Sequence, residues 1–187
     1  SRVESQEPEA FVRRLIERVV KAQLPCLWLS TLDSPLLTPR PMSIADNLHR
    51  VQERIVRAAE SAGRRAEEIM LVGVTKYVGT DEARQLAQAG CVNLGESRPQ
   101  ELWKKAEDLS DEPTSADGLP ISWHLIGHLQ RNKVARTMPL VSLIHSVDSE
   151  RLLAAIDEAR STEGDTPPPI AVLLEVNASG EAAKHGL

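Results

Sequence analysis

A single lysine ends a short apolar run in the first half of the sequence. The run, MLVGVTKY, covers residues 70–77 and places Lys76 after a stretch typical of a buried strand. Alternate residues of a strand share one face, so Lys76 would continue the row of Val72 and Val74. An amine in such a row loses hydration, which favours its neutral form and makes it a nucleophile that forms a Schiff base with a carbonyl. The simpler alternative is a surface lysine that is ion-paired or extends its charge into water.

Polar side chains also follow the other apolar runs of the chain. These are Asn93 and Glu96 after the second run, His124 and His128 around the third, His145 and Asp148 after the fourth, and Glu175 and Asn177 after the fifth. Ligand sites of parallel α/β proteins lie at the carboxyl ends of the strands. We therefore expect these groups to converge with Lys76 at one edge of a sheet.

Two histidines, His124 and His128, stand four residues apart, as zinc ligands on a helix do. The segment HLIGH lacks the glutamate of H-E-x-x-H and has a glycine in a strand-like context, so we expect histidines that line a pocket and no metal. A metal-dependent barrel hydrolase built on His124, His128 and His145 remains an alternative. Gly95 is most simply part of a turn, and the sequence has no G-x-G-x-x-G or Walker pattern, which disfavours nucleotide binding.

The elements that must position these residues alternate along the chain. Strands are expected at residues 69–75, 91–96, 121–127, 141–146 and 170–177, and helices at 42–63, 80–90, 97–109, 129–137 and 149–160. Near-continuous apolar strands that alternate with helices predict an α/β protein with a parallel sheet, either a β/α barrel or a doubly wound sheet.

Local signals predict where helices begin and which of their faces are exposed. The expected caps are Ser43 with Asp46, Thr80, and Ser97 with Gln100, and Pro99 is tolerated in a first turn. Leu102 and Trp103 are most simply core residues. Solvated helix faces are expected for the basic residues Lys104, Lys105, Arg131, Lys133 and Arg136.

Composition excludes several kinds of partner. The chain has 187 residues with 22 basic and 27 acidic side chains, a net charge of -5, so we expect neither nucleic acid nor anionic membrane as a partner. No apolar stretch reaches the roughly 20 residues needed to span a bilayer. Cys26 and Cys91 fit no disulfide framework or metal motif, and we interpret them as reduced thiols of a cytoplasmic protein.

The first 41 residues differ in character from the rest. An amphipathic piece is followed by a proline-rich stretch without a clear period, and Met42 then opens a capped helical pattern. We therefore expect residues 1–41 to be a dispensable or poorly ordered extension and residues 42–187 to form the domain.

Five segments are characteristic in their order and spacing: LVGVTKY, NLGESRPQEL, ISWHLIGHLQRNK, LIHSVDS and LLEVNASGEAAKHGL. Together they closely resemble the pyridoxal phosphate homeostasis protein family. The resemblance runs from about Met42 to Leu187. It implies a (β/α)8 barrel similar to the N-terminal domain of alanine racemase, with pyridoxal 5'-phosphate (PLP) held as a Schiff base on Lys76. Glu96 and His124 are the further residues expected to contact the cofactor.

The same resemblance sets the expectations for function. It implies a non-catalytic or weakly catalytic protein that stores, buffers or delivers PLP, with PLP-dependent apoenzymes as partners. The alternative is an amino-acid racemase, which needs a second proton-transfer group on the far face of the cofactor. Tyr77, the only tyrosine, is adjacent to Lys76 and would lie on the opposite face of the strand, which disfavours this alternative. Ser97 stands where the family often has asparagine. The chain holds about five of eight β/α units, so the phosphate-binding residues are expected beyond Leu187.

A chain beginning at Met42 is expected to fold and bind cofactor like the longer chain, because the pattern of residues 1–41 stops before the capped helix. Urea titration of both chains measures the free energy of unfolding. A loss of more than about 2 kcal/mol on removal of residues 1–41 would show that the extension packs on the domain.

Overall fold

A computed structural model describes residues 42–110, 118–161, 169–181 and 186–187. The expected extension, residues 1–41, lies outside this part of the chain, as does Cys26. The helices are α2 (Ile44–Ser61), α3 (Thr80–Gln88), α4 (Pro99–Asp108), α5 (Val134–Thr137) and α6 (Glu150–Ser161), with short 3-10 turns at Ala66–Glu68, Arg131–Lys133 and Met138–Leu140. The strands are β1 (Gly73–Val74), β2 (Asn93–Glu96), β3 (Ser122–Leu125), β4 (Val141–Val147) and β5 (Ala171–Leu174).

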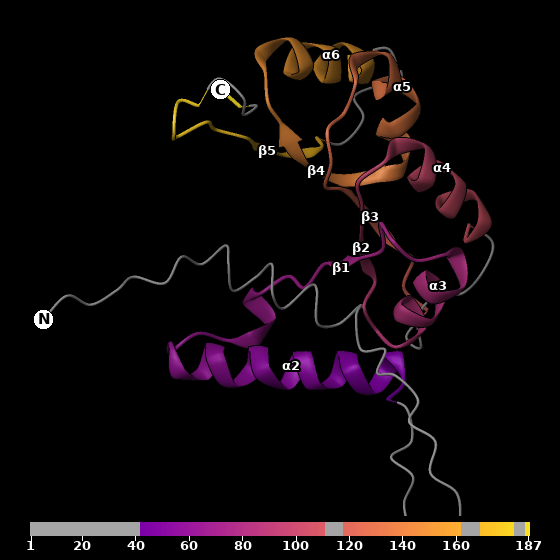
Figure 1. Cartoon of the computed structure of the whole chain (residues 1–187), viewed down its shortest axis with the longest axis vertical. Helices are drawn as coiled ribbons and strands as arrows, with labels where there is room; N and C mark the ends of the chain where they lie inside the picture. Colours follow the sequence, from indigo (N-terminus) through magenta and orange to yellow (C-terminus); the bar gives the residue numbers. More distant parts are fainter. Residues whose placement is uncertain (1–41, 111–117, 162–168, 182–185) are drawn as a thin grey trace, which may run out of the picture.

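All five described strands form one parallel sheet in the order β1-β2-β3-β4-β5. The predicted α/β class with a parallel sheet is therefore confirmed. A doubly wound sheet reverses its strand order at a switch point, and the described strands show no such reversal. Right-handed crossovers between successive neighbours place their helices on one face. Figure 1 shows α3 to α6 following one another along the outer side of the strands.

The core lies between the sheet and these helices. Leu94 pairs in register with Trp123, and Leu125 with Ile144, which puts these side chains on the face that the helices cover. Its largest fully buried apolar side chains are Leu94, Leu102, Leu125, Leu129, Met138, Ile144 and Leu152. Burial of this apolar surface supplies the main stabilisation of the described fold.

The other face of the sheet has a different character. Gly95 points to this face, because a Cβ on Gly95 would meet Val72 and Ile126 at 3.2 Å. His124 pairs in register with Gly95 and shares the face. The helix-covered face is thus the apolar core, and the opposite face holds His124.

The helix starts confirm one predicted cap and correct two. Ser43 and Asp46 form the expected reciprocal capping box of α2. Thr80 is not a cap, since Gly79 precedes α3 and its N–H donates to the Glu82 carboxylate. The predicted cap at Ser97 is wrong as well, because the Ser97 N–H donates to the Glu96 side chain before α4 begins. The N-cap of α4 is Arg98, followed by Pro99 in the first turn as expected.

Two further expectations concern Cys91 and the membrane. Cys91 is a free, buried thiol whose pKa is raised by burial, against the opposing effect of a hydrogen bond with the Gly73 backbone.

Among the helices of the described segments, none has the length and apolar character needed to cross a bilayer.

The loops that follow β2 and β3 approach each other closely at Gly127. The N–H of Ile126 donates to the Glu96 carbonyl at 2.9 Å, which draws the two strand ends together. A Cβ built on Gly127 would lie 2.2 Å from the carbonyl oxygen of Ser97. Only glycine allows this contact, because the opposing atom belongs to rigid backbone.

Gly127→Ala is therefore expected to lower the free energy of unfolding by about 2–3 kcal/mol, the scale of forced overpacking. Gly79→Ala is the matched control, because its new Cβ would meet only the end of the flexible Glu82 side chain. Urea unfolding of both variants checks the expectation. Equal stability of the two variants would contradict the tight contact at Gly127.

Candidate functional site

Lys76 lies in a turn that follows β1. The strand ends at Val74, and the Thr75 carbonyl accepts a hydrogen bond from the Val78 N–H at 3.1 Å, so Lys76 and Tyr77 occupy the middle of a tight turn. Lys76 is exposed, and its Nζ lies 5.0 Å from the centroid of the Tyr77 ring. Within the described residues, its ammonium has no hydrogen-bond or ion-pair partner.

This geometry corrects two arguments made from strand periodicity. The amine of Lys76 was expected to lose hydration at the end of an apolar row, yet Lys76 is exposed and Met70 at the start of that row is 63% exposed. Tyr77 was expected on the opposite face, yet its ring lies beneath the Lys76 ammonium. Both arguments were wrong because alternation applies only while the chain is extended, and the strand ends two residues before Lys76.

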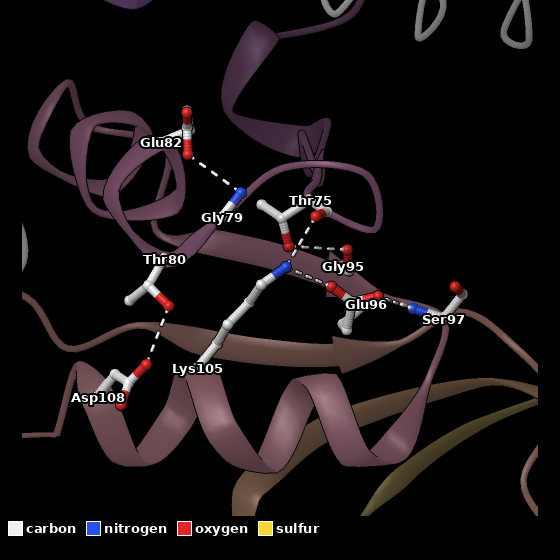
Figure 2. A network of polar contacts seen from close by, with 9 residues as sticks. All are labelled: Thr75, Gly79, Thr80, Glu82, Gly95, Glu96, Ser97, Lys105 and Asp108. Atoms are coloured by element: carbon white, nitrogen blue, oxygen red, sulfur yellow. Dashed lines mark hydrogen bonds and ion pairs between the residues drawn. The ribbon is translucent and has the colours of Figure 1, made fainter.

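Glu96, the last residue of β2, is fully buried and faces α4. Its Oε2 accepts a hydrogen bond from the Lys105 Nζ at 2.7 Å, and its Oε1 accepts one from the Ser97 N–H at 2.8 Å (Figure 2). The carboxylate is therefore fully engaged inside the protein. A direct contact of Glu96 with a cofactor stays a prediction.

Lys105 was expected on a solvated helix face, and this expectation was wrong. The side chain is only 4% exposed and forms a buried salt bridge with Glu96. It also donates to the Thr75 carbonyl at 2.8 Å. A signal for its burial exists in the sequence, because Lys105 follows the buried Leu102 by three residues and precedes the buried Leu109 by four, the spacing of one helix face.

The predicted core residue Trp103 is half-buried. Its indole N–H donates to the Thr137 hydroxyl at 3.1 Å, and the Arg136 guanidinium lies 4.3 Å from its ring centroid. Trp103 therefore joins α4 to α5 at the rim of the core, where its polar N–H finds a partner.

His124 and His145 form a pair across β3 and β4. His124 Nδ1 and His145 Nε2 are 3.0 Å apart, and His124 is only 1% exposed. Burial lowers the pKa of both rings, and for His124 the neighbouring His145 lowers the pKa further. One ring must accept the hydrogen bond of the other, so the pair requires at least one neutral imidazole.

His128 and Asp148 form a second pair, with Nδ1 and Oδ2 at 2.9 Å. Thus His124 and His145 meet each other, and His128 meets a carboxylate. Within the described ranges, no group of three histidine, cysteine or acidic residues could hold a metal ion. The three histidines are therefore not gathered into the ligand set that a hydrolase would need.

The remaining candidates differ in where they lie. Asn93 begins β2, at the opposite end of that strand from Glu96. Asn177 accepts a hydrogen bond from the Gly180 N–H and donates to the Glu181 carbonyl, so its side chain organises its own loop. Glu175 is exposed after β5.

The strand register brings the main candidates together at the carboxyl ends of β1, β2 and β3. Val74 pairs with Gly95, and Gly95 pairs with His124, so the chain segments around Lys76, Glu96 and His124 are neighbours in the sheet. Lys76 is the exposed, unpaired amine of this edge within the described residues, and Lys105 is a buried, paired one. An exposed lysine amine fits an aldehyde cofactor, which needs a reachable nucleophile.

The fold is that of an α/β protein in which the exposed Lys76 follows the first strand of a parallel sheet. No family model matches the chain. Curated relatives named pyridoxal phosphate homeostasis protein do match it: 39% identity over 146 residues in Aquifex aeolicus, covering 78% of this chain and 60% of the relative, and 30% over 160 residues in Mycobacterium leprae, covering 83% and 62%.

Solved structures agree with this similarity. A protein described as unknown, from Bifidobacterium adolescentis, has a TM-score of 0.64 at 38% identity and covers 76% of this chain and 58% of its own. PipY of Synechococcus elongatus, whose structure has PLP bound, has a TM-score of 0.52 at 30% identity, with 66% and 54% covered. The predicted resemblance to the pyridoxal phosphate homeostasis protein family is thereby confirmed. The chain spans about three fifths of the length of these relatives.

The histidine pair predicts how stability depends on pH. The folded-state pKa values of His124 and His145 are lowered from the ordinary value of 6.5, so the unfolded chain binds more protons at and below that pH. Stability is therefore expected to fall as the pH drops through 6.5 and to keep falling until the folded rings protonate.

Urea midpoints measured between about pH 7.5 and about pH 5.5 check this dependence. His145→Gln should make the midpoint less sensitive to pH. His49→Gln, at an exposed position on α2, should leave the sensitivity unchanged. An unchanged pH dependence in His145→Gln would rule out the pair as its source.

Proposed function

We propose that this chain is part of a PLP-binding protein that stores, buffers or delivers the cofactor, and that Lys76 is the residue that holds it. The supporting observation is the exposed Lys76 amine in the turn after β1, which has no hydrogen-bond or ion-pair partner in the described part of the chain. The PLP-bound relative PipY and the relatives' shared name support the cofactor's identity. PLP-dependent apoenzymes are the proposed recipients.

The proposed bond is a Schiff base. The Nζ of Lys76 attacks the aldehyde carbon of PLP, a C=N bond forms and water leaves. When bound in this way, PLP supplies an electron sink for chemistry on amines. The protein side of the site needs a lysine that reaches the aldehyde and neighbouring groups that orient the ring, and His124 is the proposed neighbour on β3.

We further propose that the five sequential strands are the first part of a (β/α)8 barrel. The strand order without reversal and the helices on one face are those of a barrel wall. The chain spans about three fifths of the matched relatives, which leaves length for the remaining units. In this arrangement the face with the His124–His145 pair is the barrel interior.

A non-catalytic role is proposed over a racemase. A two-base racemase needs proton-transfer groups on opposite faces of the cofactor. The Lys76 Nζ lies 5.0 Å from the centroid of the Tyr77 ring, so the chain's one tyrosine is on the same side of the turn as the amine. Racemisation of L-alanine by the protein with PLP would overturn this part of the proposal.

Borohydride trapping tests the role of Lys76. The chain is mixed with PLP, reduced, digested and mapped by mass spectrometry. Lys76 should be the dominant modified residue, and Lys76→Ala should lower covalent attachment at least about tenfold because the nucleophile is gone. Lys104→Ala, which removes an exposed lysine of α4, should have no effect. Undiminished attachment in Lys76→Ala would refute the assignment.

A further inference from the structure

We propose that Lys105 is a positioning residue for Lys76: the buried Lys105–Glu96 pair holds the carbonyl that closes the Lys76 turn and so presents the Lys76 amine to its ligand. The inference rests on the proposed function of Lys76. It gives a role to a buried charge pair that the Schiff base itself does not require.

The Thr75 carbonyl is the centre of the arrangement. It accepts one hydrogen bond from the Val78 N–H at 3.1 Å and another from the Lys105 Nζ at 2.8 Å. The first bond closes the turn around Lys76. The second comes from a charged donor, and such bonds are shorter and stronger than neutral ones. Lys105 thus fixes the atom on which the turn depends.

Glu96 holds Lys105 in position. Its two carboxylate oxygens are bound from different directions, by the Lys105 Nζ at 2.7 Å and by the Ser97 N–H at 2.8 Å. Glu96 is 0% exposed and Lys105 is 4% exposed. Water therefore cannot replace these bonds, and the low local dielectric strengthens them.

A second contact from α4 restrains the other end of the same segment. The Thr80 hydroxyl donates to the Asp108 carboxylate at 3.0 Å. Asp108 follows Lys105 by three residues, about one helical turn, so α4 holds the segment at Thr75 and again at Thr80 (Figure 2). The turn with Lys76 lies between these two points.

The backbone of the turn is also fixed from β2. Both the N–H and the hydroxyl of Thr75 donate to the Gly95 carbonyl, at 2.9 and 3.3 Å. Thr75 therefore has its amide, hydroxyl and carbonyl all engaged, and it is 1% exposed. The next residue, Lys76, is exposed. The arrangement combines a rigid anchor with a free amine, which lowers the entropy lost when the amine binds a ligand.

The two lysines near the turn, Lys76 and Lys105, differ in their access to an aldehyde. The Lys105 ammonium is buried and donates two hydrogen bonds, whereas the Lys76 ammonium is exposed and, within the described residues, unpaired. An aldehyde should therefore react with Lys76, while Lys105 acts only through the backbone.

The test uses the double variant Glu96→Gln/Lys105→Met in the full chain. Removing both charges together avoids leaving one of them buried without a partner, the change that most destabilises a protein. Both substitutions keep a similar side-chain volume, and Lys105→Met removes the bond to the Thr75 carbonyl. Lys104→Met is the matched control, because it removes an exposed lysine from the same helix.

Two measurements are made on each variant. Amide hydrogen exchange at Val78 reports the order of the turn without any cofactor. Borohydride trapping with PLP reports the rate of modification at Lys76. In the double variant we expect Val78 exchange to rise and Lys76 modification to slow by about tenfold or more, the scale of losing a hydrogen bond to a charged group. Exchange within α4 should stay unchanged, as should both readouts in Lys104→Met.

The outcomes separate this inference from the proposed function. If the double variant folds and both readouts match the wild type, the inference is overturned. If amides of the core exchange faster together with Val78, the pair acts on stability alone and the positioning role is rejected. If the wild type is not modified at Lys76, the proposed function fails, while Val78 exchange still decides whether the pair orders the turn.

A second variant keeps the test decisive if the double variant does not fold. Thr80→Val removes the contact with Asp108 and leaves the buried pair intact. The expected result is a rise of about threefold in Val78 exchange and a matching slower modification of Lys76, because one weaker restraint is lost. Unchanged values for both would show that the Thr80–Asp108 contact does not restrain the turn, and the claim that α4 holds the segment at two points would be wrong.

Discussion

The buried ion pair between Lys105 and Glu96 is the interaction on which the candidate site depends. Burying two charges costs several kcal/mol per ion, and the mutual attraction offsets this only when further hydrogen bonds satisfy the remaining groups. Here the Ser97 N–H and the Thr75 carbonyl provide those bonds. The pair thereby joins the end of β2, the helix α4 and the turn after β1 into one unit.

The parallel sheet explains why residues distant in sequence meet at this unit. Successive strands run in the same direction, so every strand ends at the same edge, and the loops that follow share that edge. The close approach of Gly127 to Ser97 binds the loops after β2 and β3, and the His124–His145 pair links β3 to β4. The exposed lysine lies beside a rigid polar framework.

The two faces of the sheet differ in the side chains that they hold. The helix-covered face holds the apolar core, with Glu96 and Lys105 as its buried charged side chains within the described residues. The opposite face presents the His124–His145 pair. The similarity to pyridoxal phosphate homeostasis proteins covers 83% and 78% of the chain in the two relatives described above.

The sequence by itself determined the α/β class, the order of strands and helices, the Ser43–Asp46 cap and the position of Lys76 after the first strand. These features depend on periodicity and on contacts within a few residues. The spacing of Lys105 from Leu102 and Leu109 indicates the buried face of the helix, but only the tertiary structure decided which partners, 9 and 30 residues away, satisfy its charge, and that Lys76 is exposed. A charged side chain on a helix is buried only when distant groups satisfy it, and a single sequence does not show which groups will meet.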